Sequence, residues 1–132
     1  MVFIDTSFFF AAIEPTDRAH TDAVALLQAV EGEELVTTNN IRGETWTLLR
    51  SRSGHGMAVR FLDSIDNSLV IRVEHIDRSL EDRALGWLRH HDERAYSFVD
   101  ATSFAFMEAN GISDVLSFDG DFAAAGFTEL RP

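Results

Sequence analysis

The chain contains no cysteine among its 132 residues, and only two prolines. The absence of cysteine excludes disulfides, zinc–thiolate sites and cysteine nucleophiles. Lysine is absent as well, so all 11 basic residues are arginines and any mechanism that needs a lysine is excluded. The chemistry of this protein must therefore come from other side chains.

Long apolar runs are also missing. None approaches the roughly 20 residues that a membrane span requires, and no basic region precedes the apolar N-terminal stretch, as it would in a signal peptide. We therefore expect a soluble, cytoplasmic protein with no membrane association. The length predicts a single domain, residues 1–132, that buries about two-thirds of the surface of the unfolded chain.

Several sequence motifs are absent too. The chain has no Gly-x-Gly-x-x-Gly, Gly-Lys-Ser/Thr or Gly-x-Ser-x-Gly motif, which disfavours nucleotide-binding and serine-hydrolase functions. None of the five histidines shows the spacing of metal ligands, so we expect them to be structural or surface residues.

Apolar runs and helical spacing alternate along the chain. Helical patterns separate the apolar runs, with candidate caps at Thr16 or Asp17, at Asn39 or Asn40, and at Asp77. Alternating strands and helices imply an α/β fold with a parallel sheet covered on both faces. The predicted strands cover residues 2–4, 35–37, 69–73, 115–118 and 127–130, the last of them at an edge.

Acidic residues stand where an apolar run ends or a helix begins: Asp5, Glu44, Asp100, and the pair Asp119 and Asp121. Ligands of parallel sheets bind outside the carboxyl ends of the strands. Carboxylates gathered there repel one another unless a cation lies between them, and oxygen-only ligation suits Mg²⁺ or Mn²⁺. The pattern predicts a metal-dependent reaction on a phosphate.

Each of these acids also has a simpler explanation. Asp5 and Asp100 are suitably placed to cap helices, Asp119-Gly-Asp121 is typical of a turn, and Glu44 could lie on an exposed helix face. Caps and turns alone are a poor explanation for four clusters in this order and at this spacing.

The net charge of −11 is unevenly distributed. Residues 37–62 carry +3, with Glu44 as the only acid, so the remainder carries −14. A basic arm on an acidic body can still bind a phosphate backbone, although an ordinary solvated helix face is the alternative. The candidate RNA-binding residues are Arg42, Arg50, Arg52 and Arg60.

Together, four segments resemble a known family. They are Val-Phe-Ile-Asp-Thr-Ser at residues 2–7, the mid-chain Glu44, Phe-Val-Asp-Ala-Thr-Ser at 98–103, and Ser-Phe-Asp-Gly-Asp-Phe at 117–122. This set resembles the PIN-domain ribonucleases, and more narrowly the VapC toxins of bacterial toxin–antitoxin pairs, over essentially the whole chain. The resemblance implies a PIN-like (Rossmann-like) three-layer fold, with about five mainly parallel strands, helices on both faces and a helical clip.

The resemblance also implies a set of site residues. Asp5, Glu44, Asp100 and Asp119 would form the site, with Asp121 as a fifth acid; Asp5, Asp100 and Asp119 would be the metal ligands, and Thr6 or Ser7 would support them through a hydroxyl. Whether Asp119 or Asp121 binds the metal directly stays open.

The implied function is that of a toxin-type endoribonuclease dependent on Mg²⁺ or Mn²⁺. It would cut structured RNA of the translation machinery, in a tRNA or rRNA loop, and inhibit translation and growth. Its partners would be a VapB-type antitoxin and a second copy in a homodimer.

Two other functions compete with this one. Another Mg²⁺-dependent phosphohydrolase, of the receiver or haloacid-dehalogenase type, would need a supporting lysine that this chain lacks. A non-catalytic module whose acids bind a basic partner would show no RNA cleavage in Mn²⁺, whereas the nuclease would lose its activity on chelation.

Overall fold

The chain alternates between strands and helices along its whole length, and the computed structural model describes all residues 1–132. The elements are β1 (Val2–Ile4), α1 (Thr6–Ile13), α2 (His20–Ala29), β2 (Leu35–Thr38), α3 (Asn39–Arg52), α4 (His55–Asp66), β3 (Ile71–Glu74), α5 (Arg78–Arg89), α6 (Phe98–Ala109), β4 (Asp114–Leu116), α7 (Asp121–Ala124) and β5 (Thr128–Glu129).

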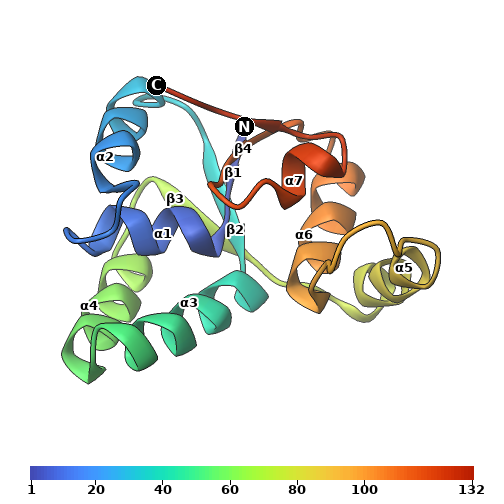
Figure 1. The fold of residues 1–132 in the computed structure, drawn as a ribbon, viewed down its shortest axis with the longest axis horizontal. Helices are drawn as coiled ribbons and strands as arrows, with labels where there is room; N and C mark the ends of the chain where they lie inside the picture. The colour runs from blue at the N-terminus through green and yellow to red at the C-terminus, as the bar shows by residue number, and fades with distance from the viewer.

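The five strands form one sheet in the order β3-β2-β1-β4-β5, and every neighbouring pair is parallel. Helices α1 to α4 cover one face, and α5 to α7 cover the other (Figure 1). The winding reverses at β1, so the carboxyl end of β1 lies at the topological switch point where such sheets bind ligands. The three-layer α/β fold predicted from the sequence is confirmed.

The central strands are short but fully buried. Phe3, Ile4, Val115 and Leu116 all have an exposed fraction of 0%. A strand covered by helices on both faces needs apolar side chains at successive positions, which explains the unbroken apolar runs. The ring of Phe3 lies 5.9 Å from that of Phe106 on α6, measured between centroids, and so joins the sheet to one helical layer.

Polar helix caps collect at one end of this sheet. Asp5, Thr38 and Ser97 are the N-caps of α1, α3 and α6, and each side chain accepts a hydrogen bond from a backbone amide in the first helical turn. Asp5 directly follows β1, and Thr38 is the last residue of β2. Capping therefore places polar side chains beside the switch point.

The predicted helix 16–30 and strand 69–73 both begin later in the structure. Helix α2 starts only at His20, because the Asp17 carboxylate accepts the Ala19 amide in a preceding turn (3.0 Å). Strand β3 starts at Ile71, because the Ser68 hydroxyl accepts the amides of Val70 and Ile71 at 3.2 and 3.0 Å and holds them in a turn.

A sharp break separates α4 from α3. Helix α4 begins at His55, directly after Gly54, whose φ of +94° permits this break. Strand β4 ends at Leu116 rather than Phe118, so Ser117 and Phe118 belong to the loop beside the switch point. None of the helices has the length and apolarity needed to span a bilayer.

Candidate active site

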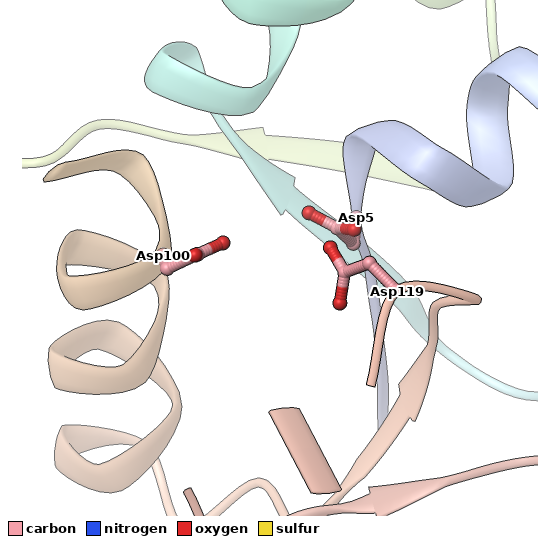
Figure 2. Close-up of side chains that lie close together, drawn as sticks. All are labelled: Asp5, Asp100 and Asp119. Atoms are coloured by element: carbon pink, nitrogen blue, oxygen red, sulfur yellow. The ribbon is translucent and has the colours of Figure 1, made fainter. Parts of the chain in front are cut away.

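Three carboxylates converge at the carboxyl end of the central strands. Asp5 follows β1, Asp119 lies in the loop after β4, and Asp100 points toward them from the first turn of α6 (Figure 2). One carboxylate oxygen from each residue lies within 4.8 Å of the other two. Residues far apart in the sequence thus form a set of oxygen ligands in the size range of a metal site.

Asp5 is held by a group of hydroxyls. Its Oδ2 accepts the Ser7 amide at 3.2 Å and the Ser7 hydroxyl at 2.8 Å, and it also lies 3.1 Å from the Ser117 hydroxyl. The Ser7 hydroxyl in turn accepts the Phe118 amide at 2.9 Å. These bonds fix the orientation of Asp5, which is only 2% exposed, and tie α1 to the loop after β4.

Asp119 is the exposed member of the cluster and sits on a tight turn. Its Oδ1 accepts the Asp121 amide at 3.0 Å and lies 3.2 Å from the Ser117 hydroxyl. Gly120 between the two aspartates has a φ of +81°, in the left-handed region that favours glycine. The Asp-Gly-Asp spacing is therefore what lets the chain fold back onto the Asp119 carboxylate.

Asp100 caps its own helix as well as facing the cluster. Its Oδ2 accepts the Ser97 amide at 3.0 Å, while the Ser97 hydroxyl accepts the Asp100 amide at 2.9 Å, which completes a capping box. The capping role considered as an alternative explanation is thus present. Since this role uses only one carboxylate oxygen, it leaves the other free to face Asp5 and Asp119.

Burial and mutual repulsion make the three acids harder to ionise. Burial, followed by the charges of Asp119 and Asp121, raises the pKa of Asp100 to about 6. Burial and the Asp119 charge raise the pKa of Asp5 well above its ordinary value, and burial and the Asp121 charge raise that of Asp119. A divalent cation would relieve this repulsion, so the donor set and its electrostatics both fit a hard metal ion.

Glu44 lies beside this cluster without being one of its three members. The Thr6 hydroxyl, at the start of α1, donates a hydrogen bond to Glu44 Oε1 on α3. The two candidate supporting residues therefore have different contacts: Ser7 binds Asp5, whereas Thr6 binds Glu44.

Asp121 also lies outside the cluster. Its Oδ1 accepts a hydrogen bond from Arg94 Nε at 3.0 Å and lies 2.9 Å from Arg94 Nη2 in an ion pair. Of the two aspartates in the Asp-Gly-Asp turn, Asp119 is the one that faces Asp5 and Asp100.

The four candidate RNA-binding arginines are spread over α3 and α4. Arg42 is on the same turn of α3 as Glu44, whereas Arg50 is exposed about 9 Å farther along the helix axis. The guanidinium of Arg52 lies over the ring of Phe10, 5.6 Å from its centroid. Arg60 lines an apolar groove described below.

Ser117 and Arg94 both contact these acids, and neither was among the predicted site residues. Ser117 lies within the motif that carries Asp119, but the predicted strand 115–118 placed it in the sheet rather than in the loop. Arg94 had no signal in the sequence, because 27 residues separate it from its partner Asp121.

A groove of about 430 Å³ lies between α1 and α4 and is almost entirely apolar. We call it the α1–α4 groove; Phe8, Phe9 and Ile13 line one side, and Met57 and Phe61 line the other. The groove runs along residues 8–13 of α1.

A parallel α/β fold with an acidic cluster at its switch point is shared by one family, which comparison of the sequence identifies. The chain belongs to the PIN domain family, which residues 2–128 match. Proteins named 23S rRNA-specific endonuclease VapC20, from two strains of Mycobacterium tuberculosis (CDC 1551 / Oshkosh and ATCC 25618 / H37Rv), are 51% identical over 132 residues, 100% of this chain and 99% of theirs. The resemblance to PIN-domain VapC toxins inferred from the sequence is confirmed.

Solved structures agree with this assignment. The crystal structure of Mycobacterium tuberculosis VapC20, described as a sarcin–ricin loop cleaving toxin, superimposes with a TM-score of 0.93 at 49% identity and covers 100% of both chains. FitAcB from Neisseria gonorrhoeae shares the fold, with a TM-score of 0.70 at 14% identity, covering 98% of this chain and 96% of FitAcB.

Proposed function

We propose that this protein is a toxin that inhibits translation by cutting 23S rRNA in the sarcin–ricin loop. The observation that carries the proposal is the convergence of Asp5, Asp100 and Asp119 within 4.8 Å at the switch point. The substrate is inferred from the relatives named as 23S rRNA-specific endonucleases, which align with the whole chain at 51% identity. Residues 1–132 would form one nuclease domain, acting in the cytoplasm.

Asp5, Asp100 and Asp119 would hold the divalent metal, Mg²⁺ or Mn²⁺. Carboxylate oxygens are the ligands both ions prefer, and the chain has no cysteine to offer a softer set. When bound, such an ion lowers the pKa of a water molecule and stabilises charge on the phosphate.

The other side chains prepare this site. Ser7 and Ser117 fix the rotamer of Asp5, and Ser117 also contacts Asp119. Thr6 binds one oxygen of Glu44, which leaves the second oxygen to accept a proton from the attacking water. Attack by water gives a 5′-phosphate and a 3′-hydroxyl, and needs neither a histidine base nor the 2′-hydroxyl of the RNA.

Cleavage of a synthetic sarcin–ricin hairpin by the purified protein tests this function. We expect cleavage with Mn²⁺ or Mg²⁺, none after chelation, and recovery when metal is restored. Asp5→Asn should be inactive, with its melting temperature preserved. Cleavage that persists in chelator, or in Asp5→Asn, would exclude the proposed mechanism.

We further propose that a VapB-type antitoxin binds the α1–α4 groove. The groove exposes an apolar surface suited to a helix or extended segment with an apolar face, and a basic side chain of that partner would neutralise the acid cluster. Arginine suits this role because its planar fork pairs with two carboxylate oxygens. A homodimer would extend the surface available to RNA around each site.

A further inference from the structure

The loop between α5 and α6, residues 90–97, contacts both the turn that carries Asp119 and the helix that carries Asp100. Its Arg94 binds Asp121, and its Ser97 caps the helix that carries Asp100. We propose that Arg94 is a positioning residue that sets Asp119 at the correct separation from Asp100. This inference rests on the proposed metal-dependent function and concerns how the three-carboxylate site is kept in register.

The first step is the contact between Arg94 and Asp121. Two nitrogens of the guanidinium, Nε and Nη2, approach the same Asp121 oxygen at 3.0 and 2.9 Å. The Nε–H group donates a charge-assisted hydrogen bond, and Nη2 lies within ion-pair distance of the same oxygen. Two nitrogens of one planar group therefore restrain both the orientation of Asp121 and its distance from the loop.

The second step leads from Asp121 to the cluster. The Asp121 amide donates to Asp119 Oδ1 at 3.0 Å, so the backbone that Arg94 restrains is the backbone that orients the Asp119 carboxylate. Arg94 also packs against the turn itself: a Cβ atom on Gly120 would lie 3.6 Å from Arg94 Nη2. The guanidinium therefore packs against the left-handed turn, which is also held by a hydrogen bond from the Gly120 amide to Glu129 Oε1 at 3.3 Å.

The third step is the link to Asp100. Ser97 follows Arg94 by three residues and exchanges two hydrogen bonds with Asp100, at 3.0 and 2.9 Å. Ser7 and Ser117 connect Asp119 to Asp5, but neither of them reaches Asp100. The Arg94–Asp121 pair is the one side-chain hydrogen bond between residues 90–109 and the Asp119 turn, and the rings of Phe104 and Phe122 pack 5.0 Å apart just beyond it.

Removal of Arg94 should change metal affinity in opposite directions, depending on whether the residue acts through its charge or by positioning Asp119. A guanidinium near three carboxylates repels an incoming cation, so if Arg94 acted only through its charge, its removal would tighten metal binding. If Arg94 positions Asp119, its removal loosens the ligand set and weakens metal binding. Supporting residues of this kind typically change metal affinity by about 10- to 100-fold.

The test is Mn²⁺ binding to the purified full-length protein without RNA, measured by calorimetry. We expect Arg94→Gln to weaken Mn²⁺ binding at least about tenfold. Arg94→Lys, which keeps the charge but loses the fork, should also weaken it. The matched control is Arg89→Gln, which removes one charge from an exposed arginine at the end of α5 and should leave the affinity unchanged. Unchanged or tighter binding by Arg94→Gln would overturn the proposal.

A second readout uses metal-free protein and does not depend on nuclease activity. The amides of residues 119–121 should exchange with solvent faster in Arg94→Gln, at an unchanged melting temperature, while protection of β1 stays the same. If those amides exchange at the wild-type rate, Arg94 does not order the turn. If instead the wild-type protein orders the turn and binds Mn²⁺ but never cleaves RNA, the proposed function fails and the positioning role stands.

Discussion

Asp100 caps its own helix and also belongs to the acid cluster. It completes the capping box of α6 through Oδ2 and faces two other carboxylates from a buried position. Because burial and its acidic neighbours raise the pKa of this residue to about 6, its ionisation costs free energy in the metal-free protein. Bringing these acids together therefore lowers the free energy of unfolding of the metal-free protein at neutral pH.

Asp100→Asn should therefore stabilise the metal-free protein while abolishing cleavage. Asparagine still accepts the Ser97 amide but carries no charge, so we expect the free energy of unfolding at pH 7.5 to rise by on the order of 1 kcal/mol. Chemical denaturation with and without Mn²⁺ measures both effects, because only the wild type should gain stability from the ion. A destabilised metal-free variant would show that the capping bond, rather than charge repulsion, dominates at this residue.

The raised pKa of Asp100 also predicts a pH dependence. Below about 6 the carboxyl binds a proton that a metal must displace, so Mn²⁺ affinity should fall as pH decreases through 6. The stability of the metal-free protein should depend on pH in the opposite direction. Protonated Asp100 contributes to the free energy of unfolding at low pH, and this contribution is lost as pH rises from about 4 toward 6. Titrations from pH 5 to 8 check the first effect, and a metal affinity independent of pH would contradict it.

Helix α3 holds its arginines in different surroundings. Its first turns bring Glu44 to Thr6 and carry Arg42, whereas its last turn carries the exposed Arg50 and also Arg52, whose guanidinium lies over the ring of Phe10 on α1. The structure thus separates the arginines that the sequence treated as one basic arm. We infer that Arg42 and Arg50 are available to bind RNA, whereas Arg52 packs on α1 and Arg60 lines the α1–α4 groove.

Replacing Arg42 and Arg50 with alanine should weaken RNA binding and reduce its salt dependence by about one to two units of slope. Replacing Arg52 and Arg60 with alanine removes the same amount of charge. It should change the salt slope less, because Arg52 lies over the ring of Phe10 and Arg60 lines the α1–α4 groove. Fluorescence anisotropy at several salt concentrations separates the two pairs. Equal slopes for both double variants would mean that these contacts do not keep Arg52 and Arg60 from binding RNA.

At the element scale, the sequence predicted the order and type of the strands and helices well, because buried parallel strands and capped helices have strong local signals. Errors arose where side chains capture backbone amides. The Ser68 hydroxyl accepts the amides of Val70 and Ile71, so β3 begins only at Ile71. Leu69 and Val70 are therefore exposed, although the apolar and β-branched residues of this segment suggested that they belong to the strand. The Asp-Gly-Asp turn could not be resolved from sequence, because the partner of Asp121 is the distant Arg94.

The whole molecule is an acidic body with a net charge of −11, built around a site that must receive a polyanion. Long-range charge therefore disfavours RNA, and we expect RNA binding to depend on local arginines and on the metal. The same acidity suits a basic partner, and the α1–α4 groove adds an apolar anchor for it.

Expression of the protein alone should arrest growth, and co-expression of the cognate antitoxin should rescue it. Met57→Arg places a charge at the mouth of the α1–α4 groove, so it should weaken antitoxin binding at least about tenfold, since a buried unpaired charge is costly. Growth arrest by this variant despite co-expressed antitoxin checks the site, with Arg18→Glu on the exposed surface as a control. Full rescue of Met57→Arg would place the antitoxin elsewhere.

The most direct test of the central claim is mapping of 5′ ends on 23S rRNA after brief treatment of ribosomes with purified protein. With Mg²⁺ or Mn²⁺, a single new 5′-phosphate end should appear within the sarcin–ricin loop, and it should be absent after chelation and in Asp100→Asn. Cleavage without metal, equal cleavage by Asp100→Asn, or ends scattered along the RNA would contradict a three-carboxylate, metal-dependent endoribonuclease.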